Sequence, residues 1–173
     1  TLIKSISGIR GTIGGNPGDN LTPIDAVKFA SAYGSFIKQQ RNKYEYRVVV
    51  GRDARLSGEM LQQLVMQTLV GMGIHVIDLD LSTTPTVELA VKLEHADGGI
   101  ILTASHNPKQ WNALKLLNEH GEFLSKNAGE RVLALAKSTL MFADVDETGK
   151  TTHDASWLQK HVDHVLGLEL VDS

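Results

Sequence analysis

The stretch GGIILTASHNP, residues 98–108, decides how the middle of this chain folds. Its first five residues, 98–102, are small or apolar and partly β-branched, which is typical of a buried strand. Asn107–Pro108 then ends the strand, because proline lacks a backbone N–H and disfavours the helical region for the residue before it. The segment must turn outward there, so we expect the Ser105 side chain to be accessible where the strand ends.

Strands and helices alternate on both sides of this stretch. Thr22–Asp25 predicts the start of a helix, with an N-cap threonine, a proline at N1 and a capping-box acid. This first helix is predicted to run to about residue 40. The spacing of apolar residues, with glycine and proline as helix and strand breakers, predicts further helices at 58–71, at 84–94 and from 125, and strands at 47–50 and 75–79. Residues 114–117 are expected to pair with 121–124 as in a hairpin. This order predicts a layered α/β/α domain with a mixed, mostly parallel sheet and loops gathered at the carboxyl ends of its strands.

Two further polar elements are expected near that rim of the sheet. Ser7–Gly11 places Arg10 between glycines, and a guanidinium offers a planar fork of donors that matches phosphate oxygens in pairs. Arg10 is therefore a candidate phosphate clamp, with an ion pair to a carboxylate as the alternative. Gly51–Arg55 follows the apolar strand residues 48–50. Its charged residues are expected to brace the loops through ion pairs rather than to touch a substrate.

These three elements, in this order and at these separations, resemble the N-terminal domain of the α-D-phosphohexomutases. Phosphoglucomutase/phosphomannomutase is the most similar type, and the resemblance runs from about Leu2 to the final helix. The resemblance implies an intramolecular phosphotransferase, an isomerase that interconverts hexose 1-phosphate and hexose 6-phosphate. It also implies a phosphoserine enzyme and a bisphosphate intermediate, with a hexose phosphate as the substrate.

The resemblance also implies roles for individual residues. Ser105 would carry the phosphoryl group and, through a phosphate oxygen, provide one ligand of a magnesium ion. His106 would assist beside it, Arg10 would orient the sugar or its phosphate, and Lys115 would manage protons on the sugar hydroxyl. The family usually has Asn-Gly where this chain has Asn112–Ala113, so we expect either slightly different backbone torsions in the turn or a position that tolerates Ala113.

Members of that family are four-domain chains, and this sequence matches only their first part. We expect residues 1–150 to be the domain with the phosphoserine loop, and 151–173 to be a linker and the start of a helix leading into a second domain. No D-x-D-x-D magnesium loop occurs, so the other magnesium ligands are expected from a missing domain. Phosphoryl transfer depends on positioning and charge neutralisation, so the isolated fragment should be nearly inactive without its partner domains.

Composition narrows the class of protein. The chain has 173 residues, 42% hydrophobic content and a net charge of -3, which fits one domain and excludes the basic excess that attracts nucleic acid. No apolar run approaches a membrane span and no signal segment is recognisable, so we expect a cytoplasmic protein that does not bind membranes. There is no cysteine and hence no disulfide or thiol chemistry. His161 and His164 share a helix face, but lack further ligands at zinc spacing, and are expected to be solvent-exposed.

Several alternatives stay open at this point. Ser105 would, in the simplest reading, only satisfy backbone donors in a loop, and Lys115 would be a solvated strand residue. A serine hydrolase is disfavoured because Gly-x-Ser-x-Gly is missing. A non-catalytic phosphosugar-binding module would bind anions through Arg10, Lys109 and Lys115 without turnover. A phosphoglucosamine mutase is a further option within the same family.

Overall fold

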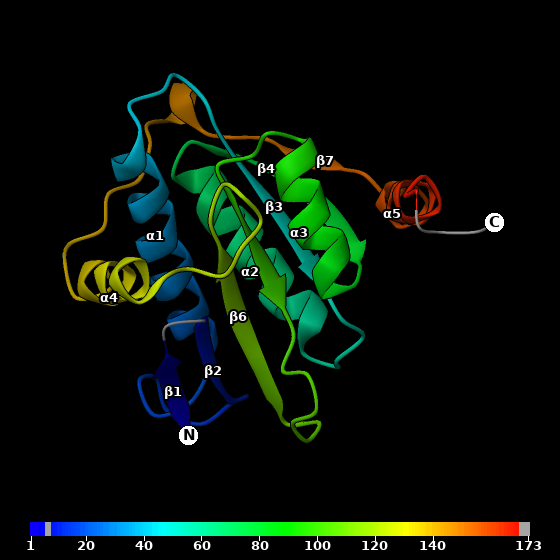
Figure 1. Ribbon diagram of the computed structural model, residues 1–173. Coiled ribbons are helices and arrows are strands. Elements are labelled where there is room, and N and C mark those ends of the chain that lie inside the picture. Colours follow the sequence, from blue (N-terminus) through cyan, green and yellow to red (C-terminus); the bar gives the residue numbers. More distant parts are fainter. Residues whose placement is uncertain (6–7, 170–173) are drawn as a thin grey trace.

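Seven strands of the described residues, 1–5 and 8–169 of the computed structural model, form one mixed sheet (Figure 1). They are β1 (Leu2–Ser5), β2 (Gly8–Thr12), β3 (Tyr46–Arg52), β4 (Ile74–Leu81), β5 (Gly98–Leu102), β6 (Trp111–Leu117) and β7 (Thr151–His153). Their order in the sheet is β1-β2-β6-β5-β3-β4-β7. β3 pairs in parallel with β4 and β5, and β7 joins β4 in parallel. β6 is antiparallel to β5 and β2, and β2 to β1.

Helices cover both faces of this sheet. They are α1 (Pro23–Gln40), α2 (Gly58–Gly71), α3 (Thr84–Leu93), α4 (Lys126–Leu135), α5 (Trp157–Leu166) and the short 3-10 helix η1 (Val145–Glu147). One buried apolar cluster joins the sheet to α1, α2 and α4, and a second joins it to α3 and the start of α5. The predicted layered α/β fold with a mixed sheet is therefore confirmed.

The central strand β5 is buried along its whole length, as the sequence predicts. Its two glycines permit helices to pack closely on both faces. A Cβ atom at Gly98 would collide with the hydroxyl of Tyr33 in α1, and one at Gly99 would collide with Val91 in α3. Ile100 and Ile101 then fill the two cores on opposite faces. Residues 98–102 thus hold both layers together and deliver the serine loop to the carboxyl end of the strand.

The capping box at the start of α1 is confirmed. The Thr22 side chain accepts from the backbone N–H of Asp25, and the Asp25 carboxylate accepts from the backbone N–H groups of Thr22 and Gly18. The other predicted helices and the strands around 47–50 and 75–79 are also present, with ends that differ by a few residues. These elements have periodic apolar residues and clear breakers, which is why the sequence predicts them well.

One predicted pairing differs from the structure. Residues 121–124 do not form a second hairpin strand, since only a single bridge between Leu117 and Phe123 is made. β6 pairs with β2 and β5 instead, in complete ladders. The residues on either side of position 150, the expected end of the domain, form η1 and the edge strand β7 of the same sheet.

α5 is attached to α3 by specific contacts. The Trp157 side chain is buried in the second core, and the Nδ1 atom of His161 lies 2.9 Å from the hydroxyl of Thr86. The expectation that solvent exposure alone explains His161 is therefore wrong for this residue, whereas His164 is exposed. Several apolar side chains of α5, among them Leu158 and Val162, are exposed. Within the described residues, no helix has the length and apolar character needed to cross a membrane.

Replacing Tyr33 with phenylalanine tests the packing around β5. Its buried hydroxyl donates to the carbonyls of Leu117 (2.7 Å) and Gly99 (3.3 Å). Losing this donor should lower the free energy of unfolding by about 1–2 kcal/mol, while the exposed Tyr44→Phe control should change it little.

Tyr33 also predicts a dependence of stability on alkaline pH. Burial raises the pKa of Tyr33 above its ordinary value of 10.0. Above pH 10 the unfolded chain releases this proton and the folded chain retains it, so folding loses about 1.4 kcal/mol per pH unit from this group. Tyr33→Phe should remove that part of the slope. Urea unfolding between about pH 9 and pH 11 measures it, and equal slopes in both proteins would contradict the prediction.

Candidate active site

The loop after β5 presents Ser105 in an unusual backbone conformation. Its φ is +52°, in the left-handed region, where among the described non-glycine residues only Asp80 and His95 also lie. The side chain is exposed, as the sequence predicts. The backbone N–H of Ser105 donates to the hydroxyl of Thr103 (3.1 Å), and the N–H of Asn107 donates to the carbonyl of Ala104 (3.0 Å). The loop thus has its own hydrogen bonds, and the serine hydroxyl is directed to solvent.

His106 lies next to the serine but is not firmly joined to it. The Oγ atom of Ser105 and the Nδ1 atom of His106 are 3.5 Å apart, at the outer limit of a hydrogen bond. Both side chains are exposed. This geometry differs from a serine activated by a firmly bound histidine, in which the hydroxyl and the base are within about 2.6–3.2 Å. His106 is therefore beside the Ser105 oxygen without being arranged as the base of a hydrolase.

Residues at and after the end of β3 stabilise the serine loop through hydrogen bonds. The Asp53 carboxylate accepts a hydrogen bond from the Thr103 hydroxyl (2.6 Å) and from the backbone N–H of Arg55 (3.0 Å). Arg52 extends the network to α2 and β4 through Gln62 (2.8 Å) and Asp80 (2.7 Å). The expected bracing role is present, although Arg55 acts mainly through backbone carbonyls of the loop rather than through ion pairs.

Arg10 is on a strand, and not in a loop as expected. It lies in β2 and pairs with Ala113 of β6. Sequence reasoning missed β1 and β2 because their glycines and polar residues are typical of a loop. β2 is a strand because it pairs with β6 on one side and with β1 on the other. Ser7, part of the predicted element, lies outside the described residues. Within the part of the chain that the structure describes, the exposed Arg10 guanidinium makes no ion pair, which leaves its donors available to an anion.

The sheet brings Arg10 and Lys115 together. Gly8 pairs with Lys115 two positions along the ladder from Arg10 and Ala113, so alternation places both cationic side chains on one face. They line a hollow of about 260 Å³ that also contains Ser5, Gly8 and Ala113. The N–H of Thr103 donates to the carbonyl of Ala113 (3.2 Å), so the serine loop begins beside this hollow. Ser105 and His106 are not among its lining residues.

Lys115 has a partly enclosed environment. Its Nζ atom lies 5.8 Å from the centre of the Phe123 ring, which is an attractive cation–π arrangement. Burial raises the pKa of the Glu88 carboxyl in α3, and the Lys115 ammonium opposes that rise. The lysine thus lies over an aromatic ring and lines the hollow. It is not simply a solvated strand residue.

Asn112 and Ala113 are not in a turn, contrary to the expectation. Both belong to β6 and both are buried. The Asn112 side chain donates to the hydroxyl of Ser57 (2.9 Å), which ties β6 to the start of α2. Ala113 has no positive φ, so a residue with a Cβ atom is accommodated where the family usually has glycine. The strand register, rather than glycine-like torsions, sets the position of Lys115.

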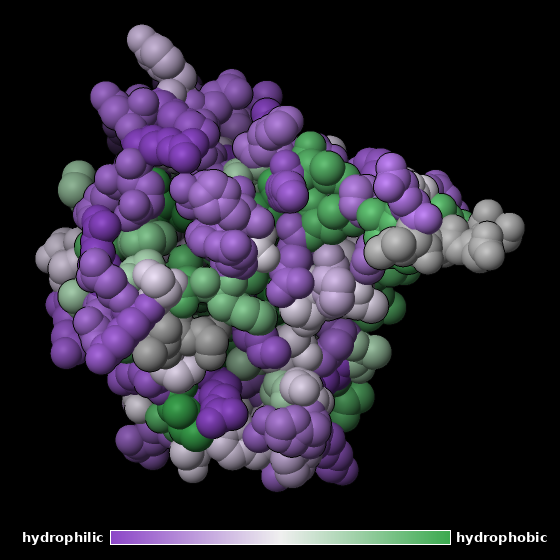
Figure 2. Space-filling view, in the orientation of Figure 1, coloured by the Kyte–Doolittle hydropathy of each residue, from purple (hydrophilic) through white to green (hydrophobic). Residues whose placement is uncertain are grey.

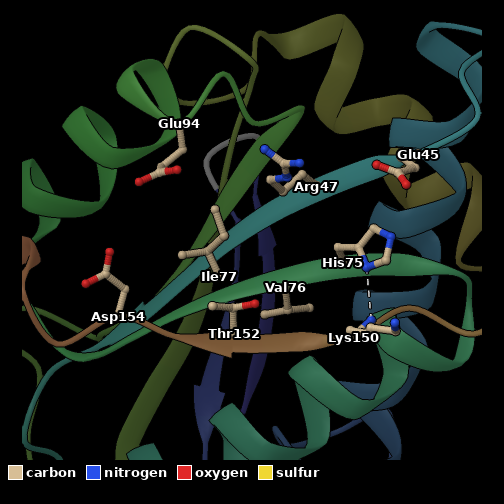
Figure 3. A pocket seen from close by; sticks show the side chains of 9 residues that line it. All are labelled: Glu45, Arg47, His75, Val76, Ile77, Glu94, Lys150, Thr152 and Asp154. Atoms are coloured by element: carbon tan, nitrogen blue, oxygen red, sulfur yellow. Dashed lines mark hydrogen bonds between the residues drawn. The ribbon is translucent and has the colours of Figure 1, made fainter.

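The largest hollow described lies elsewhere. It has a volume of about 380 Å³, and Figure 3 shows Arg47, His75 and Lys150 around it on β3, β4 and the segment leading into β7. It sits towards the amino ends of these parallel strands, whereas the serine loop follows the carboxyl end of β5. It contains cations and carboxylates in mixture, and none of the site residues predicted from the sequence lines it. Size alone would therefore select a hollow that contains none of the residues predicted for the chemistry.

The fold and this loop define a class of protein: an α/β/α domain with an exposed serine in the loop after its central strand and a hollow lined by an arginine and a lysine. Residues 2–141 match the family described as phosphoglucomutase/phosphomannomutase, alpha/beta/alpha domain I. The chain therefore belongs to this family and contains its first domain. The resemblance of the three polar elements to the phosphohexomutases is confirmed by this match.

Relatives with known names support the same family. A phosphoglucomutase/phosphomannomutase of Thermococcus kodakarensis is 41% identical over 67% of this chain and 26% of that protein. A phosphoglucosamine mutase of Ligilactobacillus salivarius is 38% identical over 76% of this chain and 28% of that protein. The chain thus spans about a quarter of the length of these relatives.

Solved structures support the fold. The crystal structure of a phosphoglucomutase/phosphomannomutase family protein from Burkholderia thailandensis superimposes with a TM-score of 0.78 at 23% identity, and the match covers 96% of this chain and 36% of that one. At this identity the likeness concerns the fold alone. The α/β/α arrangement described above is thus the arrangement found in that protein.

Proposed function

We propose that this chain is the serine-bearing part of an enzyme that interconverts hexose 1-phosphate and hexose 6-phosphate. Ser105 would carry the phosphoryl group. In the forward half-reaction the bond between its Oγ atom and phosphorus breaks, a bond from phosphorus to a sugar hydroxyl oxygen forms, and the hydroxyl proton passes to a base. The resulting bisphosphate would turn over and return its other phosphoryl group to Ser105.

One observation carries this proposal: the exposed serine at φ +52° lies in a loop that begins beside a hollow lined by two cations. A phosphorylated serine must be reachable by the substrate, and the doubly charged phosphate of the sugar needs positive groups to hold it. Arg10 would hold that phosphate or orient the sugar, Lys115 would accept and return the proton of the sugar hydroxyl, and His106 would assist near the phosphoryl group.

Magnesium fits this site in part. Phosphate oxygens are hard ligands of the kind that Mg²⁺ prefers, so a phosphorylated Ser105 would supply one ligand. Among residues 1–5 and 8–169 no group of three or more histidine, cysteine, aspartate or glutamate side chains could hold a metal ion. The remaining ligands would come from outside this chain. When bound, the ion would neutralise charge on the transferred group.

We propose that a following domain packs on α5. Five apolar side chains on and just after this helix are 40–50% exposed: Leu158, Val162, Val165, Leu166 and Leu168. Some of them form a shallow apolar hollow of about 180 Å³. Figure 2 shows apolar surface on the projecting arm that carries α5. Contiguous exposed apolar side chains on a helix usually mark an interface. The relatives are longer than this chain, so a following domain of the kind they contain could cover these side chains.

Mass spectrometry of the full-length protein tests the proposal. After incubation with a hexose bisphosphate, the intact mass should rise by one phosphoryl group, and peptide analysis should place that group on Ser105. An acyl adduct on Ser105 from an activated ester would instead indicate a hydrolase. Absence of any modification, with hexose phosphate still bound, would indicate a binding module and would overturn the proposal. If Ser105 is phosphorylated, turnover assays with glucose, mannose and glucosamine phosphates would identify the preferred sugar. These three sugars are chosen because the similar proteins are named phosphoglucomutase/phosphomannomutase and phosphoglucosamine mutase.

A further inference from the structure

The side chain of Arg55 donates hydrogen bonds to the backbone of the serine loop. Its Nη2 atom donates to the carbonyls of Ser105 (2.7 Å) and Asn107 (2.8 Å), and its Nη1 atom donates to those of Pro108 (3.0 Å) and Trp111 (3.0 Å). One guanidinium thus binds four carbonyls that span the loop from the serine to the start of β6. No other side chain in the described residues makes so many contacts with this loop.

Arg55 is itself held in place. Its Nε atom lies 3.3 Å from the Asp53 carboxylate as an ion pair, though without the alignment of a hydrogen bond, and its side chain is only 12% exposed. The same carboxylate accepts from the Thr103 hydroxyl, and the N–H of Asp53 donates to the carbonyl of Leu102 (3.0 Å). The end of β3 is therefore joined to both ends of the serine loop.

This arrangement uses chemistry that only arginine has. A guanidinium has five N–H donors in a rigid plane, and hydrogen bonds from a charged donor are stronger than neutral ones. A lysine ammonium in the same place would reach fewer carbonyls and would have no fixed fork. Both Nη atoms are already engaged twice, and the Nε atom, which makes no aligned hydrogen bond, is buried against Asp53. Arg55 therefore has no accessible donor with which to bind a sugar phosphate.

We infer that Arg55 is a positioning residue for the phosphoryl-carrying serine. A non-glycine residue at a positive φ is unfavourable unless its surroundings hold it, and the carbonyl of Ser105 is one of the groups that Arg55 binds. Arg55 fixes the backbone that aims the Ser105 oxygen, and does so without touching the substrate. This inference rests on the proposed function.

The kinetics of full-length Arg55→Lys test the inference. Misplacing a reacting group by about 1 Å lowers the rate by about a hundredfold, so kcat should fall about 100-fold while KM for hexose phosphate stays within about threefold. The rate at which Ser105 is phosphorylated by a hexose bisphosphate should fall in parallel. The matched control is Arg41→Lys, a surface residue whose ion pair with Glu119 is exposed, and it should leave both rates unchanged.

Chemical rescue separates positioning from general destabilisation. Full-length Arg55→Ala should regain part of its kcat when guanidinium ion is added at concentrations too low to unfold the protein, and Arg41→Ala should show no such gain. Unchanged kcat and phosphorylation rate in Arg55→Lys would overturn the inference. A loss of kcat that only follows a loss of folded protein, with no rescue, would overturn it as well.

Hydrogen exchange distinguishes failure of this inference from failure of the proposed function. In Arg55→Lys the amides of Asn107 and Trp111, which bond within the loop, should exchange faster, while those of α1 should not change. If the wild type neither turns over hexose phosphates nor phosphorylates Ser105, the proposed function fails, and faster exchange would still show that Arg55 holds the loop. If the wild type does phosphorylate Ser105 but exchange in Arg55→Lys is unaltered, the positioning role of Arg55 is rejected and the proposed function stands.

Discussion

Full-length protein with Ser105→Ala should lose interconversion of hexose 1- and 6-phosphates by about a thousandfold or more. Removing a covalent nucleophile leaves only binding and electrostatic contributions to the rate, and these are small compared with the whole effect. The substitution removes just the oxygen that would carry the phosphoryl group. A coupled assay of product formation measures the loss, and phosphoserine should disappear from the loop peptide.

A second substitution at the same position makes this prediction sharper. Glycine adopts the φ of +52° seen at Ser105 without steric cost, so Ser105→Gly should abolish turnover while the folded state keeps or gains stability. Activity and stability would then move in opposite directions, which a merely damaged fold does not allow. The control Ser138→Ala, at the end of α4, should leave turnover within about twofold. Full activity in either Ser105 variant would reject the phosphoserine mechanism.

Lys115→Met should produce the second large effect, a fall in kcat of about 100-fold to 10,000-fold in the full-length protein. That is the range for losing a general acid or base. Methionine retains the length and the apolar contact with Phe123 but cannot transfer a proton. Ser105 should still become phosphorylated by a hexose bisphosphate, but more slowly, because the lysine that accepts the proton of the sugar hydroxyl would also return it when that oxygen loses its phosphoryl group.

The matched control is Lys137→Met, an exposed lysine beyond α4, which should not alter the rate. The readouts are kcat, KM and the occupancy of phosphoserine at position 105. A variant of Lys115 with kcat within about threefold of wild type would remove this residue from the mechanism. A variant with normal kcat but a raised KM would assign Lys115 to binding the substrate phosphate instead.

The sequence allows much of the domain to be predicted. The apolar run at 98–102, the proline after it and the capping box at Thr22–Asp25 each act within a few residues, so local sterics and hydrogen bonding are enough to identify them. The serine loop is also recognisable, since its residues are contiguous. Its exposure was predicted because a loop that follows a buried strand and contains proline must leave the core.

Other parts of the site could not be predicted because they depend on residues distant in sequence. Arg10 is on a strand that pairs with β1 on one side and with β6, about 100 residues later, on the other. The pairing with β6, and not a turn at Asn112–Ala113, brings Lys115 to the face that carries Arg10. The sequence signal for Arg55 was its place after a buried strand, but nothing in Gly51–Arg55 indicates which carbonyls it would bind.

The alternating elements, the accessible serine and the family with its contiguous motif can all be predicted from the sequence. The fold is needed to see that Arg10 and Lys115 line one hollow and that Arg55 binds the carbonyls of the serine loop. This difference follows from the range of the interactions. Helix starts and strand ends are set by interactions between near neighbours, whereas the contacts of the site join β2, β3, β5 and β6, and these exist only once the sheet has assembled in its observed order.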